Sequence, residues 1–377
     1  MSHPDAERTS SPSRGHSDEV RVGIFLFPCG DGDTILIQLP GDRWALVDCC
    51  LPNDGTRQQF FDFVKDKKIP RLDWIFQTHP DYDHFHGMVQ VLDYFTSDGR
   101  TVGYWCDSGL TVPHIQSLVR WWSNTSRKRY KQLQAHLDDL DDRSALKFVE
   151  LNDRVEPISP AGYEGGIDFF PIGPSATLKR RTARADLARL GRDPQAKVET
   201  NELSVVLALC MAEGDAQCNA LLPGDAGPVA LPEALAAWRS RGQEHGHSDG
   251  FDVVKIPHHG SLRTHVPEVC KAKRVEASDR VAAVSASGSE AHPDREVLRD
   301  YVTEGWTVMA TMPRVRDRPS DSPAWLADRS SVPKPTTDRH LIEISWTSTK
   351  GLDWKPPQAV VDPDRVDLYE TAADSTK

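Results

Sequence analysis

The chain has 377 residues, of which 38% are hydrophobic and 27% charged, a balance typical of soluble globular proteins. Its formal net charge of −11 disfavours tight nonspecific binding of a polyanion, because such binding requires positive charge to displace counterions. No apolar run approaches the roughly 18 residues of a membrane span, and residues 1–19 are polar throughout, without the apolar stretch of a secretory signal. We therefore expect a cytoplasmic protein that makes no membrane contact and begins with a flexible tail.

The first hundred residues contain short apolar runs and two segments with helical spacing. A tight "CGDGD" turn separates the first two runs, and the order of sheet, helix, strand and helix is typical of a layered α/β domain. The expected elements are strands at 20–27, 34–40, 43–50 and 71–78, and helices at 55–68 and 87–95.

The rest of the chain alternates between short apolar strands and longer polar segments. Residues 113–147 are expected to be mainly helical, 176–200 form an Arg-rich insertion, and the proline- and charge-rich 313–335 predict a long loop. A final strand is expected at 340–346. We interpret 20–347 as one domain with insertions near these three segments, followed by a C-terminal extension at 348–377.

The seven cysteines are odd in number and form no CxxC pair. This pattern disfavours a disulfide framework or a thiolate zinc site, and it is typical of a reducing compartment. Cys49 and Cys50 are adjacent, and we expect them in or beside a core strand rather than as reactive thiols.

Residues 78–87, "THPDYDHFHG", concentrate metal-ligating side chains in one turn after an apolar strand. Strand ends are common places for functional sites because the strand is rigid and its end is open to solvent. The candidates in this turn are His79, Asp81, Asp83 and His84, with His86 as an additional imidazole.

Three other apolar strands end in an acid or a histidine. "ALVD" ends in Asp48, "NALLPGD" ends in Asp225, and "DVVKIPHHGS" presents His258 and His259. Strands of one sheet can bring such ends together, and oxygen and imidazole ligands without thiolates suit zinc, manganese or iron. The pattern therefore indicates a metal centre in which one late carboxylate, Asp225, could lie between two ions.

These motifs resemble a known family. "THPDYDHFHG" is similar to the HxHxDH motif of the metallo-β-lactamase superfamily, in the variant with aspartate in place of the second histidine. "GDGDTILIQLPGDRWALVD", "THPDYDH", "NELSVVLAL", "ALLPGD" and "DVVKIPHHGS", in that order, resemble the soluble hydrolase domain of bacterial DNA-uptake competence channel proteins. The resemblance extends from about residue 20 to about residue 346 and includes "HPDREVLRDYVTEGWTV" at 292–308.

The resemblance implies an αβ/βα sandwich of two mixed sheets flanked by helices, with two divalent ions, Zn²⁺ or Mn²⁺, at one edge. By position, His79 and Asp81 would bind the first ion. Asp83, His84 and one of the pair His258 and His259 would bind the second, and Asp225 would bridge. Asp48 would orient the histidines.

The chain departs from the family pattern at three places. Cys50 stands where many relatives have glycine, and Phe85-His86 stands where Ile-Gly or Val-Gly is common. The superfamily usually has a further histidine between the HxHxDH motif and the bridging aspartate, and here the candidates are His114 and His136. Because neither lies at a convincing strand end, we expect the first ion to be held weakly.

The function that follows is metal-dependent hydrolysis. The cations would lower the pKa of a water from about 15.7 towards 7, and Asp81 or Asp83 could accept its proton. The resemblance favours a phosphodiester, with DNA or a nucleotide as substrate, and Arg180, Arg181 and Arg184 or "SRKR" at 126–129 contacting phosphates. Two alternatives remain: a hydrolase of a small ester, lactone or phosphoester, and a catalytically silent scaffold stabilised by metal.

Overall fold

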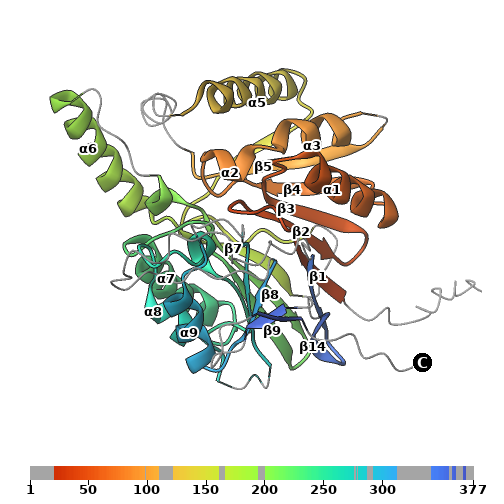
Figure 1. Cartoon of the computed structure of the whole chain (residues 1–377), viewed down its shortest axis with the longest axis vertical. Helices are drawn as coiled ribbons and strands as arrows, with labels where there is room; N and C mark the ends of the chain where they lie inside the picture. Colours follow the sequence, from red (N-terminus) through yellow and green to blue (C-terminus); the bar gives the residue numbers. More distant parts are fainter. Residues whose placement is uncertain are drawn as a thin grey trace, which may run out of the picture.

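Two mixed β-sheets pack face to face, with helices on their outer surfaces (Figure 1). The computed structural model describes residues 21–97, 99–109, 122–160, 166–193, 200–275, 277, 279–286, 292–311, 341–355, 359–361 and 368–370. Within these residues each sheet has eight strands, in the orders β14-β13-β1-β2-β3-β4-β5-β6 and β16-β15-β12-β11-β10-β9-β8-β7. The αβ/βα sandwich expected from the sequence is confirmed.

The first sheet combines an antiparallel half with a parallel half. β1, β2 and β3 form an antiparallel meander, whereas β3, β4, β5 and β6 are parallel. The carboxyl ends of these parallel strands therefore lie at one edge, where ligands bind in open α/β sheets. The strands are β1 (Arg21–Leu26), β2 (Thr34–Leu39), β3 (Arg43–Cys49), β4 (Arg71–Phe76), β5 (Thr101–Asp107), β6 (Lys147–Glu150), β13 (Ile342–Thr347) and β14 (Gly351–Lys355).

The second sheet repeats this plan. β7, β8 and β9 are antiparallel, and β9, β10, β11 and β12 are parallel, so the ends of β9 and β10 also share an edge. The strands are β7 (Ile167–Gly173), β8 (Val206–Glu213), β9 (Ala216–Leu222), β10 (Val253–Lys255), β11 (Val281–Val284), β12 (Thr307–Ala310), β15 (Ala359–Val361) and β16 (Leu368–Glu370).

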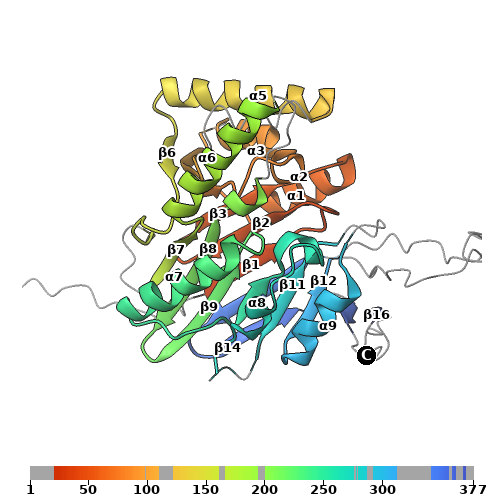
Figure 2. The ribbon, with the colours of Figure 1, turned by 90° about the vertical axis from the view of Figure 1, so that its left-hand side faces the viewer.

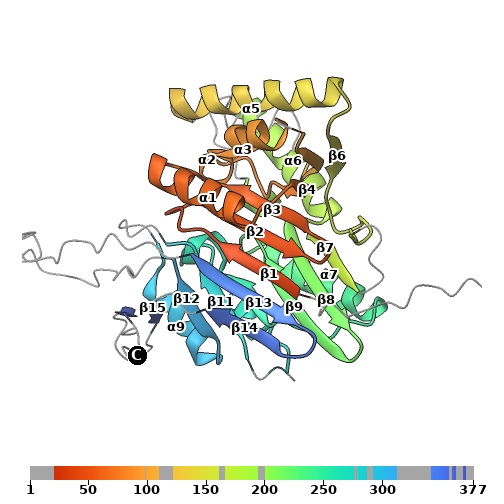
Figure 3. The same cartoon turned by 90° about the vertical axis from the view of Figure 1, so that its right-hand side faces the viewer.

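The helices cover the outer faces of the two sheets (Figures 2 and 3). Those on the first sheet are α1 (Asp54–Asp66), α2 (Tyr82–Phe85), α3 (Met88–Phe95) and α5 (Asn124–Asp142). Those on the side of the second sheet are α6 (Ala176–Arg192), α7 (Ala230–Glu244), α8 (Pro267–Lys271) and α9 (Arg295–Thr303), with short 3₁₀ turns η1 (Asn201–Leu203) and η2 (Pro257–Gly260). Helix α6 extends away from the body (Figure 1).

The continuous apolar runs of the sequence are explained by burial of both faces of each sheet. In β2, Ile35 and Ile37 pack into the core between the two sheets, whereas Leu36 packs into the core beneath the helices of the first sheet. A third core lies between the second sheet and α7, α8 and α9, and it includes Trp238 and Tyr301. A strand buried on both sides reads as an apolar run rather than as an alternation.

The structure corrects one expectation about the chain's organisation. The strand expected at 340–346 is not the last, because β14 pairs with β13 and β15 pairs with β12. The mainly helical segment expected at 113–147 is confirmed over α5. Residues 110–121 lie outside the described residues, as do 1–20 and the predicted loop at 313–335. None of the described helices is long and apolar enough to cross a bilayer.

Candidate metal centre

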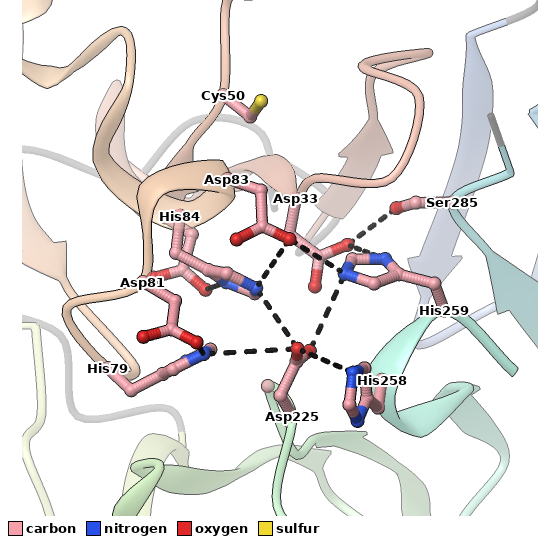
Figure 4. Close-up of polar contacts among 12 residues, drawn as sticks. Asp33, Cys50, His79, Asp81, Asp83, His84, Asp225, His258, His259 and Ser285 are labelled. Atoms are coloured by element: carbon pink, nitrogen blue, oxygen red, sulfur yellow. Dashed lines mark hydrogen bonds and ion pairs between the residues drawn. The ribbon is translucent and has the colours of Figure 1, made fainter. Parts of the chain in front are cut away.

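The predicted ligands meet at the edge where the ends of β3 and β4 face the ends of β9 and β10 (Figure 4). Gly224 is needed for this meeting. It has a φ of +55°, and a Cβ atom there would lie 2.7 Å from the Cβ of Thr78. A side chain at this position would therefore separate the Asp225 loop from the turn that begins at Thr78.

Asp225 is the centre of the cluster. Its Oδ2 lies 3.9 Å from His79 Nε2, 3.4 Å from His84 Nε2 and 3.6 Å from His258 Nε2. Its Oδ1 lies 3.6 Å from His259 Nε2. One buried carboxylate thus faces four imidazoles that come from two loops far apart in the sequence.

Asp81 and Asp83 flank this carboxylate on two different sides. Asp81 Oδ2 lies 3.8 Å from His79 Nε2, whereas Asp83 Oδ2 lies 3.9 Å from His84 Nε2 and 3.7 Å from His259 Nε2. The side chains of Asp81 and Asp83 are 35% and 40% exposed, while that of Asp225 is 4% exposed. The open side of the cluster is therefore lined by these two carboxylates.

Asp48, at the end of β3, fixes the orientation of the turn. It accepts hydrogen bonds from the Thr78 backbone N–H at 2.8 Å and from the Thr78 hydroxyl at 2.6 Å. Its Oδ2 lies 2.7 Å from His84 Nδ1. A carboxylate on Nδ1 keeps a proton there and fixes the ring, so that Nε2 is directed at Asp225 and is the nitrogen placed to bind a cation.

His258 and His259 both direct Nε2 at Asp225 because the backbone between them is left-handed. Their φ angles are +44° and +53°, which is uncommon for residues other than glycine. His258 Nδ1 lies 3.2 Å from Asn201 Nδ2 and 3.1 Å from Thr264 Oγ1. The spacing left open which of the two histidines would be a metal ligand. In the structure, both are placed to be one.

Asp33 and Lys255 belong to the cluster and were missed in the sequence. Asp33, in the β1–β2 turn, contacts the Lys255 ammonium, accepts a hydrogen bond from Ser285 Oγ at 2.5 Å and lies 3.7 Å from His259 Nδ1. Lys255 Nζ lies 3.9 Å from Asp225 Oδ1. A signal was available, because Lys255 is a charged residue inside the apolar run "DVVKIP" and a lysine is rarely buried unless it is paired.

Burial and neighbouring charge set the protonation of the cluster. Burial, with a contribution from His84, lowers the pKa of His79 to about 3, and burial lowers the pKa of His259 to about 3. Burial would also lower the pKa of His84, but Asp225, Asp48 and Asp83 outweigh it and raise that pKa well above its usual range. The protein atoms around the Asp83 carboxyl partly desolvate it and, with the charge of Asp225, raise its pKa to about 7.

The donor set fits divalent cations. His79 Nε2, His84 Nε2, both ring nitrogens of His259 and Asp225 Oδ1 are buried and make no hydrogen bond within the described part of the chain. A buried polar atom without a partner costs about 1–3 kcal/mol, a cost that a bound cation removes. Asp33, His84, Asp225 and His259 each offer a ligand atom within 4.8 Å of the others.

The other histidines considered in the sequence lie at the edge of the Asp225 cluster or away from it. The His86 ring packs 4.7 Å from Tyr82, and His136 pairs with Asp93 on the outer helices. His292 lies beside the cluster, with its ring 5.8 Å from that of His258. His114 lies outside the described residues. None of the described three contacts Asp225 in the structure. All seven cysteines are buried, and none forms a disulfide.

No curated protein matches the sequence. Among solved structures, the metallo-beta-lactamase fold protein YhfI from Bacillus subtilis is 11% identical, with 79% of this chain and 98% of that chain covered and a TM-score of 0.41. A diphosphatase from the PhnP family is 13% identical (74% and 91% covered, TM-score 0.37), and Zn²⁺-bound PqqB from Methylobacterium extorquens is 14% identical (74% and 85% covered, TM-score 0.38). Residues 27–174 match the model of the Metallo-beta-lactamase superfamily.

Proposed function

We propose that this protein is a metal-dependent hydrolase that cleaves a phosphodiester with an activated water. The observation that carries the proposal is the convergence of four imidazoles and two further carboxylates on Asp225. Several of their nitrogen and oxygen atoms are buried without a hydrogen-bond partner, and this set of atoms fits a cation better than any other class of ligand.

We assign the ligands to two positions that share Asp225. His79, Asp81 and His258 would hold the first cation, and Asp83, His84 and His259 would hold the second. In this assignment His258 supplies the imidazole that the sequence lacks between the HxHxDH motif and the bridging aspartate. The division is supported by the flanking carboxylates, because Asp81 lies 3.8 Å from His79, whereas Asp83 lies 3.9 Å from His84 and 3.7 Å from His259.

When bound, two such cations lower the pKa of a water to about 7 and offset the negative charge that develops on the phosphoryl oxygens. The chain's own residues prepare for this chemistry. Asp48 holds the tautomer of His84, and Lys255 balances part of the negative charge of Asp33 and Asp225. Asp81 and Asp83, on the open side, are placed to accept the water's proton.

The preference for a phosphodiester rests on the order of the motifs and on the charge of α6. Arg180 and Arg184 are exposed on this projecting helix, whereas Arg181 is exposed but pairs with Glu233 at 3.3 Å. A basic helix of this kind could position the backbone of DNA or of a nucleotide. The second candidate, hydrolysis of a small ester, lactone or phosphoester, is favoured by the modest cavity of about 250 Å³ beside His79.

The test combines metal analysis with a substrate panel. The purified chain, loaded with Mn²⁺ or Zn²⁺, is offered plasmid DNA, single-stranded DNA and bis(p-nitrophenyl) phosphate, and Asp83→Ala serves as the inactive control. Cleavage of DNA that is abolished in the variant supports the proposal. Turnover of the small diester alone favours the second candidate, and bound metal without turnover of any of them favours the scaffold.

A further inference from the structure

A cavity of about 250 Å³ opens beside His79. It lies past the carboxyl ends of β4 and β5, and α5 forms its opposite wall. Gln77 and His79 line the cavity, and His79 also belongs to the turn that carries the candidate ligands. A molecule in the cavity would therefore lie next to the metal centre without occupying it.

Three aromatic side chains line the cavity. Trp105 and Tyr130 are 1% and 5% exposed, whereas Phe148, on β6, is 45% exposed. Tyr130 is held by ring contacts with Phe85 at 5.3 Å and Trp122 at 5.1 Å. Two fixed rings and one ring open to solvent form walls that suit a flat aromatic ligand, because such a ligand can stack on them.

The polar groups of the cavity are mainly acceptors. Asp107 is fixed in place by hydrogen bonds from Trp105 Nε1 at 2.8 Å and from the Gly109 N–H at 2.7 Å. Gln134 and Asp138 project from α5, and Gln77 lies at the end of β4. Among the lining residues that the structure describes there is no lysine or arginine, so the cavity disfavours a phosphate and favours an uncharged ring that carries N–H donors.

We propose that this cavity is a subsite for a nucleobase, the base of a nucleotide ester whose phosphorus lies at the metal centre. The position of the phosphorus rests on the proposed function, whereas binding of the base does not. The base edges offer amino and imino N–H groups to Asp107, Gln134 and Asp138, and the ring contacts Phe148. The volume admits one base with part of its sugar, so the natural substrate is a nucleotide end or a small nucleotide rather than the middle of a duplex.

Binding of the base is measured first, without catalysis. Adenosine is titrated into the full-length, metal-free protein by calorimetry, with inosine to change the donor pattern, phenol as a plain ring and ribose 5-phosphate as a sugar phosphate without a base. We expect saturable binding of adenosine, weaker binding of phenol and none of ribose 5-phosphate. Phe148→Ala and Gln134→Ala should each weaken adenosine binding by about five-fold or more, Phe148→Tyr should retain it, and Leu187→Ala, an exposed apolar residue of α6, should leave it unchanged.

Kinetics then connect the subsite to the reaction. With thymidine 5′-(p-nitrophenyl phosphate) and methyl p-nitrophenyl phosphate as substrates, Phe148→Ala should raise KM for the first and leave KM for the second unchanged, with similar kcat. The subsite proposal is wrong, even where diesters are cleaved, if adenosine does not bind. It is also wrong if adenosine binds Phe148→Ala and Gln134→Ala as tightly as it binds the wild type. If adenosine binds as expected and no diester is cleaved, the subsite stands and the phosphodiesterase proposal fails.

Discussion

The ammonium group of Lys255, on β10 of the second sheet, contacts the carboxylate of Asp33, in the β1–β2 turn of the first sheet. Both side chains are almost fully buried, at 3% and 2% exposed. Burial raises the pKa of Asp33, but Lys255, His259 and His84 together outweigh burial and hold that pKa below its usual range. The pair therefore joins the two sheets beside the metal centre as an ion pair inside the protein.

Replacing Lys255 with methionine should destabilise the metal-free protein by about 3–5 kcal/mol, because it leaves a buried carboxylate without its partner. The change is measured by urea unfolding in the presence of a chelator. The double variant Asp33→Asn with Lys255→Met removes both charges and should recover much of the stability. A single variant as stable as the wild type would show that the ion pair contributes nothing to folding.

Replacing His258 or His259 with alanine should remove one bound metal ion in each case. The two variants should lose different ions. We expect two ions per wild-type chain after gel filtration, and one ion in His258→Ala and in His259→Ala, as counted by mass spectrometry of the metal content. His265→Ala, which removes an imidazole that pairs with Asp300 of α9, should retain both ions. Two ions in His258→Ala would refute the assignment of His258 to the first position.

Asp48→Asn should weaken metal binding by about 10- to 100-fold while the protein remains folded, because an amide on His84 Nδ1 no longer fixes the tautomer that leaves Nε2 free. Competition with a chromophoric chelator measures the affinity, and circular dichroism checks the fold. Asp73→Asn is the matched control. It alters another buried carboxylate of the first sheet, one that pairs with Arg43 and Arg71 away from the cluster, so it should change stability and leave metal affinity intact.

His247 should make the protein less stable at mildly acidic pH. It packs between Trp238 and Phe170, and burial lowers its pKa below the usual 6.5. The folded state then binds fewer protons than the unfolded state. The contribution of the neutral, packed His247 ring to the free energy of unfolding is therefore fully present above about pH 6.5 and is lost as the pH falls. His247→Phe should therefore gain stability relative to wild type between pH 7.5 and pH 5.5, measured by urea midpoints; a constant difference at the two pH values would contradict this.

Changing Arg180, Arg181 and Arg184 together to alanine should weaken binding of single-stranded DNA and flatten its salt dependence. Removing one arginine–phosphate interaction reduces the slope of log K against log salt by about 0.7. The comparison is a second triple variant, Arg127, Lys128 and Lys131 to alanine, on the basic face of α5. Unchanged affinity and slope in the α6 variant would remove that helix from the binding surface, and weaker binding confined to the α5 variant would place the phosphates there.

Much of the fold follows from local patterns in the sequence. Apolar runs such as "TILIQL" predict strands, and a strand buried on both faces needs no tertiary information to be recognised. The turn from His79 to His84 was equally readable, because its ligands lie within one short segment after a strand. Asp48 and Asp225 could be predicted as well, since each ends an apolar strand. The strand β14 was not predicted, because its short polar sequence is ordered by pairing with β13.

Only the tertiary structure brought in Asp33 and showed that both His258 and His259 face Asp225. Asp33 contacts Ser285, 252 residues away, and nothing local marks either residue as part of a site. The directions of the two histidines depend on a left-handed backbone that holds both imidazoles towards Asp225. The cavity beside His79 likewise exists because α5 packs over the ends of β4 and β5. Local sequence determines what each strand end carries, but the packing of two sheets decides which ends meet.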